Sequence, residues 1–168
     1  MEYTLIYSDR KTLSLSVKGG VLTVRAPRRT PRKVIDLFLE KHEEWIEKHL
    51  EKEKARCEKF DSLSEDDIKL IKREAKKYLK DKTEHFANIM GIKYGRITIT
   101  GAKTRFGSCS SKGNISYSYR LMLYPEQARE YVVVHELAHV CEMNHSKRFY
   151  AIVERFLPDY KERRRLLR

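Results

Sequence analysis

Two histidines and the glutamate beside the first of them are the residues of this sequence best suited to chemistry. His135, Glu136 and His139 lie in the segment YVVVHELAHVCEMN, and a third histidine, His145, follows it directly. On an α-helix, residues i and i+4 share one face, so both imidazoles of the pair can bind one metal ion. Glu136 lies about 100° around the helix from His135, close enough to reach a water on that ion without being a ligand. Because hydrolytic zinc requires neutral imidazoles and one open coordination position, the pattern predicts a zinc-dependent hydrolase.

Three residues are candidates for the third metal ligand. His145 completes the spacing H-E-x-x-H-x5-H that metzincins use. Metzincins turn the chain with a glycine three residues after the second histidine, whereas this chain has Glu142 there, and Asn144 could supply the left-handed residue instead. Glu142 itself is within reach of the metal, and Glu154 on the following helix would give a gluzincin-like site. We expect His145 to be the ligand, with Glu154 the next alternative.

The histidine pair lies in a segment that is apolar on nearly every side. Three consecutive valines favour a strand, but the histidine spacing and the acidic residues Glu126 and Glu130 near the segment's start favour a helix. Burying unsatisfied histidines would cost several kcal/mol, and metal binding removes that cost. We therefore expect a buried helix over 126–142, with its apolar surface formed by Val132, Val133, Val134, Leu137, Ala138 and Val140.

Length and composition predict a single domain without a membrane segment. The chain has 168 residues, 40% of them hydrophobic, and a mean hydropathy of −0.66, which suits one core with a helical elaboration. No apolar run approaches the roughly 20 residues that cross a bilayer. The segment MEYTLIYSDRKTL lacks the apolar region and cleavage site of a secretory signal, so we expect a cytoplasmic protein. We divide the domain (1–168) into an N-terminal β meander (1–27), a helical section (30–90) and a metal-binding core (92–168).

The cysteines do not indicate a disulfide-bonded or cysteine-ligated structure. Cys57, Cys109 and Cys141 are odd in number and form no C-x-x-C pair. A disulfide framework is therefore disfavoured, and a structural zinc site made of four cysteines is excluded. We interpret all three as small, semi-buried thiols.

The charge of the chain favours anionic partners. The net charge is +12 and the pI is near 9.6, which suits nucleic acid, nucleotides or acidic surfaces. The section 92–125 contains no Asp or Glu, and its strand-like pattern predicts an antiparallel sheet leading into the histidine helix. Such a sheet would form an electropositive wall beside the metal, from Lys93, Arg96, Lys103, Arg105, Lys112 and Arg120.

The first half of the chain alternates strand and helix signals. Three short strands are expected within residues 3–25, the last two joined by a hairpin at Gly19-Gly20. A helix is expected from Thr30-Pro31 to about residue 59. A second helix should begin with a capping box, Ser64 to Asp67, and end at Gly91. Nothing near His42 and His49 supplies further metal ligands, so we assign them no metal role, and we interpret His85 as a surface or packing residue.

The second half of the chain resembles a known family. The segments KTRFGSCSSKGNISYSYRLML and VVVHELAHVCEMNHSKRFYAIVERFLPDYKERRRLL closely resemble the YgjP-like metallopeptidases, relatives of the SprT-like and WLM zinc peptidases. The segment RKTLSLSV…VLTVRAPRRTP also resembles the opening of that family. Phe106 stands where the family commonly has tryptophan, and no Gly-rich hairpin occurs between Trp45 and Ser64. The resemblance implies a compact α+β domain of the zincin type, with small antiparallel or mixed sheets packed on helices, Zn²⁺ on His135, His139 and His145, and Glu136 as general base.

Three functions fit these features. The first is a peptidase in which Glu136 takes the proton of a zinc-activated water and passes it to the leaving group. The second is a nucleoside triphosphate pyrophosphohydrolase, favoured by the acid-free basic section. The third is a nucleic-acid-associated protein with SprT-like peptidase activity, in which the excess positive charge serves docking. The developing oxyanion needs a second electrophile, for which the nearby candidates are Arg105, Tyr117 and Tyr119.

Overall fold

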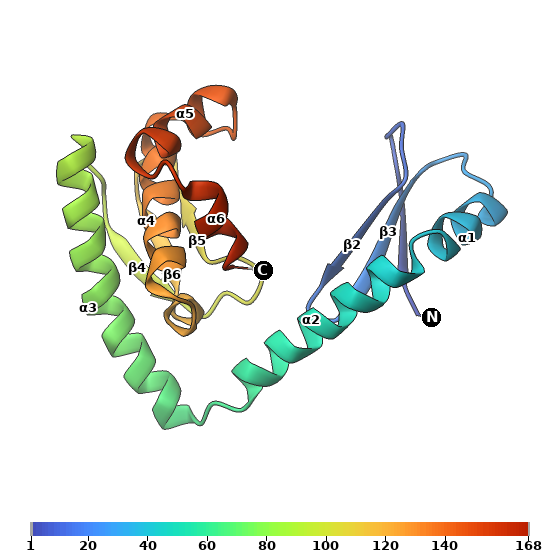
Figure 1. The fold of residues 1–168 in the computed structure, drawn as a ribbon, viewed down its shortest axis with the longest axis horizontal. Coiled ribbons are helices and arrows are strands. Elements are labelled where there is room, and N and C mark those ends of the chain that lie inside the picture. The colour runs from blue at the N-terminus through green and yellow to red at the C-terminus, as the bar shows by residue number, and fades with distance from the viewer. Residues whose placement is uncertain (1, 168) are drawn as a thin grey trace. The chain divides into compact units, whose positions relative to one another are not determined.

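The computed structural model describes residues 2–167, apart from the side chain of Lys59. The chain forms two compact units, which divide between Leu63 and Ser64. Each unit combines helices with a sheet of three strands (Figure 1). The α+β class with small mixed sheets is therefore confirmed.

The first unit contains a three-stranded sheet followed by two helices. Its elements are β1 (Thr4–Ser8), β2 (Ser14–Lys18), β3 (Val21–Pro27), α1 (Arg32–Glu40) and α2 (Glu43–Asp61). The predicted hairpin is confirmed, because Gly19 and Gly20 have φ angles of 58° and 78°, which favour glycine.

The sheet of the first unit differs from the predicted antiparallel meander. Its order is β1-β3-β2, so β1 pairs in parallel with β3 while β2 pairs with it antiparallel. The physical reason lies in β3, whose alternate residues Leu22, Val24 and Ala26 are buried. The apolar face of such a strand is best buried when the strand lies in the centre of the sheet, between two neighbouring strands.

The predicted long helix from residue 30 is divided at His42. His42 leaves the helical region, with φ −116° and ψ 19°. Its ring Nδ1 lies 2.7 Å from the carbonyl oxygen of Phe38, the partner that its own backbone amide would have in a continuous helix. The amide of His42 donates instead to Leu39 at 3.0 Å. The helix also begins at Arg32, after Pro31, rather than with a cap by Thr30.

The second unit contains a long helix, a second sheet and three further helices. The elements are α3 (Glu65–Met90), β4 (Ile97–Thr100), β5 (Gly107–Cys109), β6 (Ile115–Ser118), a 3-10 turn (Tyr119–Leu123), α4 (Glu126–Cys141), α5 (Lys147–Phe156) and α6 (Tyr160–Arg165). Both predicted ends of α3 are confirmed, since Ser64 and Asp67 form a reciprocal capping box and Gly91 is left-handed with φ 66°.

The sheet of the second unit is also mixed rather than antiparallel. The order is β4-β6-β5, with β4 parallel and β5 antiparallel to β6. Again the central strand is the most buried, since Ile115 and Tyr117 are fully covered. An antiparallel meander in the chain order β4-β5-β6 would have left β6 on an edge. The strand β5, which precedes it, is one of the two edges.

The helix α4 lies at the centre of the second unit (Figure 1). It packs against α3, β5, α5 and α6. The predicted burial on nearly every side is confirmed: Tyr131, Val133, Val134, Leu137 and Ala138 all belong to the main core. Tertiary packing therefore determines that the three consecutive valines form helix, against their strand propensity.

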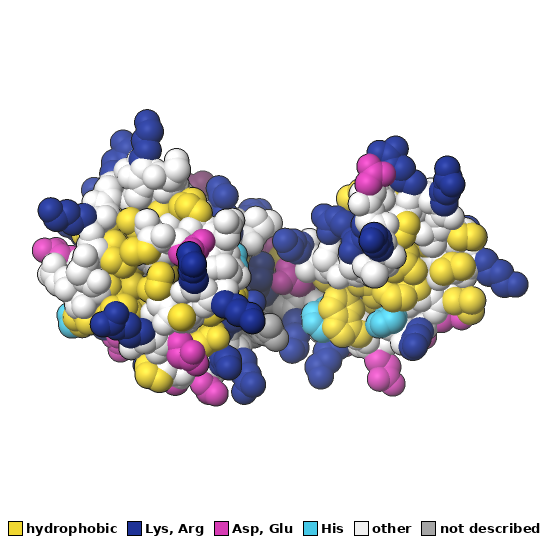
Figure 2. Space-filling model, turned by 90° about the horizontal axis from the view of Figure 1, so that it is seen from above, with side chains coloured by type: hydrophobic (Ala, Val, Ile, Leu, Met, Phe, Trp, Pro, Cys, Tyr) yellow, Lys and Arg dark blue, Asp and Glu magenta, His cyan; other side chains and the backbone are white. Residues whose placement is uncertain are grey.

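On the face of the molecule shown in Figure 2, Lys and Arg side chains are spread out and separated by hydrophobic and neutral side chains. Among the helices in the described part of the chain, none is both long and apolar enough to cross a membrane.

Candidate metal centre

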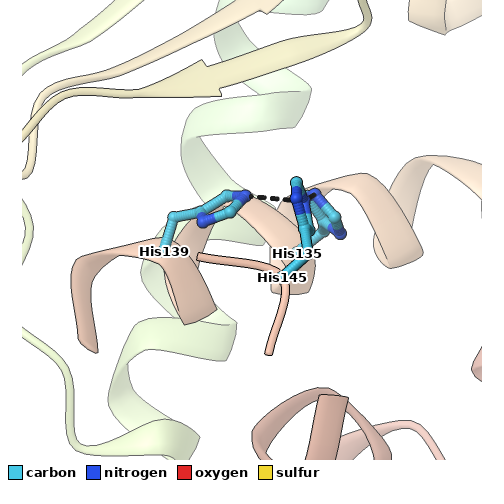
Figure 3. A group of neighbouring side chains, drawn as sticks. All are labelled: His135, His139 and His145. Atoms are coloured by element: carbon cyan, nitrogen blue, oxygen red, sulfur yellow. Dashed lines mark hydrogen bonds between the residues drawn. The ribbon is translucent and has the colours of Figure 1, made fainter. Parts of the chain in front are cut away.

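The three predicted ligand histidines lie together. The Nε2 atom of His145 is 3.0 Å from that of His135 and 3.1 Å from that of His139. Figure 3 shows the three imidazoles turned toward one another. In the described part of the chain, these three side chains form a group able to hold a metal ion, with all ligand atoms within 4.8 Å of one another.

The first two histidines are placed by α4 and the third by the turn after it. His135 and His139 are one helical turn apart, so their rings leave α4 on the same face. His145 comes directly before Ser146, whose hydroxyl caps α5 by accepting from the amide of Phe149 at 3.3 Å. The prediction that Asn144 turns the chain in a left-handed conformation is wrong, because no described residue other than glycine has a positive φ. The turn is closed instead by a hydrogen bond from the Ser146 amide to the Asn144 carbonyl at 2.7 Å.

The two carboxylates considered as alternative ligands are not part of this group. Glu154 lies exposed on α5, and Glu142 ends α4. Neither is among the side chains whose ligand atoms converge. Glu142 contributes through its main chain, because its carbonyl oxygen lies 3.2 Å from Nδ1 of His139.

Partners on the outer nitrogens orient both helix histidines. A carbonyl oxygen can only accept, so the contact with Glu142 requires Nδ1–H on His139 and leaves its Nε2 lone pair free. Nδ1 of His135 lies 3.3 Å from the hydroxyl of Tyr131, one turn earlier on α4. Such contacts fix the ring orientation of metal ligands. Sequence reasoning missed Tyr131, although its i, i+4 spacing to His135 was a visible signal.

A phenylalanine supports all three imidazoles. Phe149 on α5 is fully buried, and its ring centroid lies 4.8, 4.5 and 4.8 Å from those of His135, His139 and His145. The ring limits the positions that the imidazoles can adopt and excludes water from their inner side. The docking of α5 on α4 is therefore part of the site.

The environment keeps the helix histidines neutral. Burial lowers the pKa of His135, and the neighbouring His139, His145 and Arg164 act in the same direction, so that the pKa falls to about 3. Burial also lowers the pKa of His139. Neutral imidazole is the form that binds metal, so protonation does not compete with a metal ion near neutral pH.

Glu136 is a buried carboxyl group pressed against a strand. Its side chain is 4% exposed, and burial raises its pKa to about 8 although Arg105 opposes the shift. It fits because residue 107 on β5 is glycine: a Cβ there would stand 2.7 Å from the Glu136 Cδ atom. One oxygen, Oε2, has no hydrogen-bond partner among the described residues. A buried carboxyl oxygen without a partner is costly, which indicates that a bound group normally meets it.

The three residues suggested as a second electrophile differ in their position. Tyr117 is fully buried, and its hydroxyl lies 3.0 Å from that of Thr83, so it belongs to the core. Tyr119 is also buried, with Lys72 above its ring. Arg105 is exposed and close enough to Glu136 to oppose the rise of its pKa. The structure adds Arg164 on α6, which acts on His135 and which the sequence did not indicate.

The donor set fits a divalent metal ion. Ligand nitrogens at about 2.0–2.1 Å from a tetrahedral ion lie roughly 3.3 Å from one another, close to the distances between these Nε2 atoms. The hydrogen bond from Nδ1 of His139 to the Glu142 carbonyl leaves Nε2 available to a metal ion. Glu136, whose Oε2 has no partner among the described residues, directly follows His135 on α4. Three imidazoles and an adjacent carboxyl group are the composition of a hydrolytic metal centre.

These features define an α+β protein with a group of three histidines able to hold a metal ion, two of them on one helix. The chain belongs to the YgjP-like family, because the family's metallopeptidase domain matches residues 11–68 and 62–168. The predicted family is therefore confirmed, and with it a metallopeptidase-type domain that uses a metal ion. No curated protein matches the chain.

Two solved structures are similar to part of the chain. The metallopeptidase zymogen abylysin of Pyrococcus abyssi is 27% identical, with a TM-score of 0.49, over 53% of this chain and 90% of that chain. The metallopeptidase zymogen jannalysin of Methanocaldococcus jannaschii is 19% identical, with a TM-score of 0.47, over 53% of this chain and 92% of that chain.

Proposed function

We propose that the protein is a zinc-dependent peptidase, with Zn²⁺ held by His135, His139 and His145 and Glu136 as general base. The observation that supports this most strongly is the convergence of three Nε2 atoms beside a buried carboxyl group with an unpartnered oxygen. Membership of a metallopeptidase family supports the reaction class. Three imidazoles with an open fourth position suit zinc.

Each residue has a separate task in this proposal. The bound metal ion supplies Lewis acidity and a water of lowered pKa. Glu136 accepts the proton of the attacking water at Oε2 and later delivers it to the leaving amine. Burial removes the carboxyl group from bulk solvent, so it can hold the accepted proton between the two steps. Tyr131 and the Glu142 carbonyl keep the imidazoles in place.

Negative charge that develops on the scissile carbonyl needs a cation or donor nearby. Two arginines act on the centre from different elements: Arg105, beside Glu136, and Arg164, beside His135. Both are exposed and therefore able to move toward a substrate. We propose Arg164 for the oxyanion, since it acts on the metal ligands, and consider Arg105 separately below.

The test compares the zinc-loaded protein with its Glu136→Gln variant on unfolded protein and on nucleoside triphosphates. Glu136→Gln should abolish peptide hydrolysis while metal analysis still finds one zinc per chain. Glu154→Gln is the matched control, because this exposed glutamate should leave both activity and zinc unchanged. Loss of zinc from Glu136→Gln would show that Glu136 is a ligand. Hydrolysis of triphosphates alone would replace the peptidase proposal by the phosphoanhydride one.

Association with nucleic acid is a second candidate property, favoured by the net charge of +12. The dispersed basic side chains suit contacts to phosphates rather than to bases. Binding to duplex DNA should then weaken with salt, with a slope of roughly −0.9 per phosphate contacted. Absence of binding at low salt would remove this candidate. We propose the cytoplasm as the compartment, in keeping with three cysteines that are all free.

A further inference from the structure

A small polar pocket lies beside the sheet of the second unit. It is lined by Thr100, Ala102, Arg105, Gly107, Ser108, Ser116 and Ser118, and its volume is about 100 Å³. On β6, Ile115 and Tyr117 face the core, so the alternate residues Ser116 and Ser118 face the opposite side of the sheet. The pocket therefore lies between the outer face of the sheet and the segment 101–106 that joins β4 to β5.

Hydrogen bonds hold the walls of this pocket. The Ser118 hydroxyl donates to the Ala102 carbonyl at 2.8 Å, and the Ser118 amide donates to the Phe106 carbonyl at 2.8 Å. The Thr100 hydroxyl donates to the Tyr117 carbonyl at 3.3 Å. These bonds fix the connecting segment on the sheet, so the pocket is formed before any ligand arrives.

Two other hydroxyls remain available to a ligand. Ser108 and Ser116 face each other across β5 and β6, which places their hydroxyls side by side. Both are half-buried, and no hydrogen bond of either hydroxyl is present in the described part of the chain. Half-buried hydroxyl groups that face a preformed cavity are suited to donate to an acceptor placed in it.

The charged residue in the lining of the pocket is positive, and among the described residues the lining contains no acidic one. Arg105 is the charged member of the lining, and no acidic residue occurs anywhere in the section 92–125. A guanidinium group with adjacent hydroxyl donors is the arrangement that binds carboxylate and phosphate groups. The volume is far below the roughly 300–1,000 Å³ of pockets that hold whole small molecules. The pocket suits a single oxyanion group and excludes a complete nucleotide.

Gly107 connects the pocket to the candidate metal centre. Gly107 lines the pocket with its backbone, and its Cα faces the Glu136 side chain on the other side of β5. Because β5 is an edge strand, its outer side is not covered by another strand. A peptide held at the metal centre therefore has this pocket within reach of a neighbouring side chain.

We propose that this pocket is a specificity subsite that binds an oxyanion on the substrate peptide, the carboxylate of Asp or Glu or a phosphate ester. Arg105 forms the ion pair, and Ser108 and Ser116 donate hydrogen bonds. The inference rests on the proposed peptidase function. It assigns Arg105 to substrate selection rather than to the oxyanion of the reaction.

The first experiment measures kcat/KM of the zinc-loaded full-length protein on quenched peptides that differ only in Glu or Gln, scanned through the positions flanking the cleaved bond. At one position the Glu peptide should be preferred by about tenfold, a typical effect of one charge-assisted hydrogen bond. Arg105→Gln should bring this ratio to about 1, and Ser116→Ala should reduce it by a smaller factor. Lys112→Gln removes an equal charge from the turn before β6 and should keep the full ratio. A ratio unchanged by Arg105→Gln, or an equal loss on both peptides, overturns the subsite.

A second experiment tests the pocket without turnover. Calorimetry with the zinc-loaded Glu136→Gln protein should show tighter binding of the Glu peptide than of the Gln peptide, and Arg105→Gln in that background should remove the difference. A phosphoserine peptide that binds more tightly still identifies a phosphate ester as the preferred group, while competition by inorganic phosphate confirms the oxyanion chemistry. Equal affinities for Glu, phosphoserine and Gln peptides overturn the subsite even when peptide hydrolysis is confirmed. Selective binding without hydrolysis by the wild type would instead overturn the proposed function alone.

Discussion

The two units contain sheets of the same topology, but they differ in what covers the central strand. In both sheets the third strand in sequence is central, the first pairs with it in parallel and the second antiparallel. The cluster around β3 is small, with Val24, Ala26 and Ile35 as its buried members. The sheet around β6 belongs to a much larger core that includes most of α4. A large core can hold polar side chains in fixed positions, and two of the three clustered histidines lie on the helix that passes through it.

The histidines of the two units illustrate this difference. His42 and His49 each place Nδ1 2.7 Å from the carbonyl oxygen four residues earlier, on the same stretch of chain. Their rings lie against Phe38 and Trp45 near the surface. The histidines of the second unit come from two elements and converge on one point. Among the described residues, only in the second unit does another segment of the chain add a third histidine to a pair on one helix, and the group so formed is able to hold a metal ion.

The largest expected effect is the loss of the metal in His145→Ala. With two ligands left, zinc affinity should fall by at least about 100-fold, and peptide hydrolysis should disappear. His42→Ala is the matched change in the first unit and should leave metal content and activity intact. Metal analysis after dialysis against a weak chelator measures the difference. Retention of zinc by His145→Ala, and its loss from Glu154→Ala, would establish the gluzincin-like alternative.

The next largest effect is expected from Gly107→Ala. A Cβ at this position would overlap with Oε1 of Glu136, so the carboxylate must move. Misplacement of a general base by about 1 Å costs on the order of 100-fold in rate. We expect kcat to fall by that factor while zinc stays bound.

The control for this change is Gly101→Ala, in the segment that joins β4 to β5. The nearest atom to a Cβ there is a ring carbon of Tyr119 at 3.5 Å, an ordinary contact. Its activity should stay within about twofold of wild type, because nothing has to move. Equal losses in the two variants would show that the fold of the loop, rather than the Glu136 carboxylate, is affected.

A smaller effect is expected in stability, from the ion pairs that join α3, α4 and α6. Glu130 accepts from Lys82 and from Arg163, both at 2.7 Å, with the three side chains 19, 27 and 18% exposed. Glu130→Gln should lower the free energy of unfolding by about 1–3 kcal/mol, since two partly buried cations each lose one of their two acidic partners. Asp9→Asn in the first unit should cost at most about 0.5 kcal/mol, because its pair with Arg28 is largely exposed. Denaturant titration compares the two, and equal costs would contradict the difference in burial.

We expect Glu130 to make the free energy of unfolding depend on pH in the acid range. Burial raises the pKa of Glu130, but hydrogen bonds from Lys82 and Arg163 outweigh it and the net pKa is lowered from 4.5. A carboxylate with a depressed folded-state pKa stabilises the protein above pH 4.5, and this contribution is lost as the pH falls through the folded value. Between pH 6 and pH 3 the unfolding free energy of the wild type should therefore fall more steeply than that of Glu130→Gln. Parallel slopes would show that Glu130 does not contribute.

The parts of the structure that the sequence predicted depend on local spacing. The capping box at Ser64, the left-handed Gly91 and the glycine hairpin each follow from residues within a few positions of one another. The positions of His135 and His139 follow from the period of the helix. His145 could be selected because its spacing after His139 matched a known pattern.

The parts that the sequence did not predict depend on contacts between distant elements. The parallel pairing of β1 with β3, and of β4 with β6, depends on which strand of each sheet is most deeply buried. Periodicity within a single strand does not contain that information. The approach of Gly107 to Glu136 joins residues 29 positions apart. Arg164 reaches the site because Arg163 binds Glu130 and holds α6 on α4. The left-handed conformation of Asn144 was inferred from metzincins, which use a glycine to turn the chain. In this protein the turn is closed instead by the hydrogen bond from the Ser146 amide to the Asn144 carbonyl.

In the proposed metal site, the position of His145 directly before the cap of α5 would link metal binding to the order of folding. His135 and His139 are neighbours as soon as α4 forms, a local event on the sub-microsecond to microsecond scale. In the folded protein the third imidazole lies beside them, directly before the Ser146 cap and against the ring of Phe149. With the proposed ligands, a nascent chain would hold zinc weakly through two nitrogens early and tightly only when α5 is in place. Metal uptake at full affinity would then report that this part of the chain has folded.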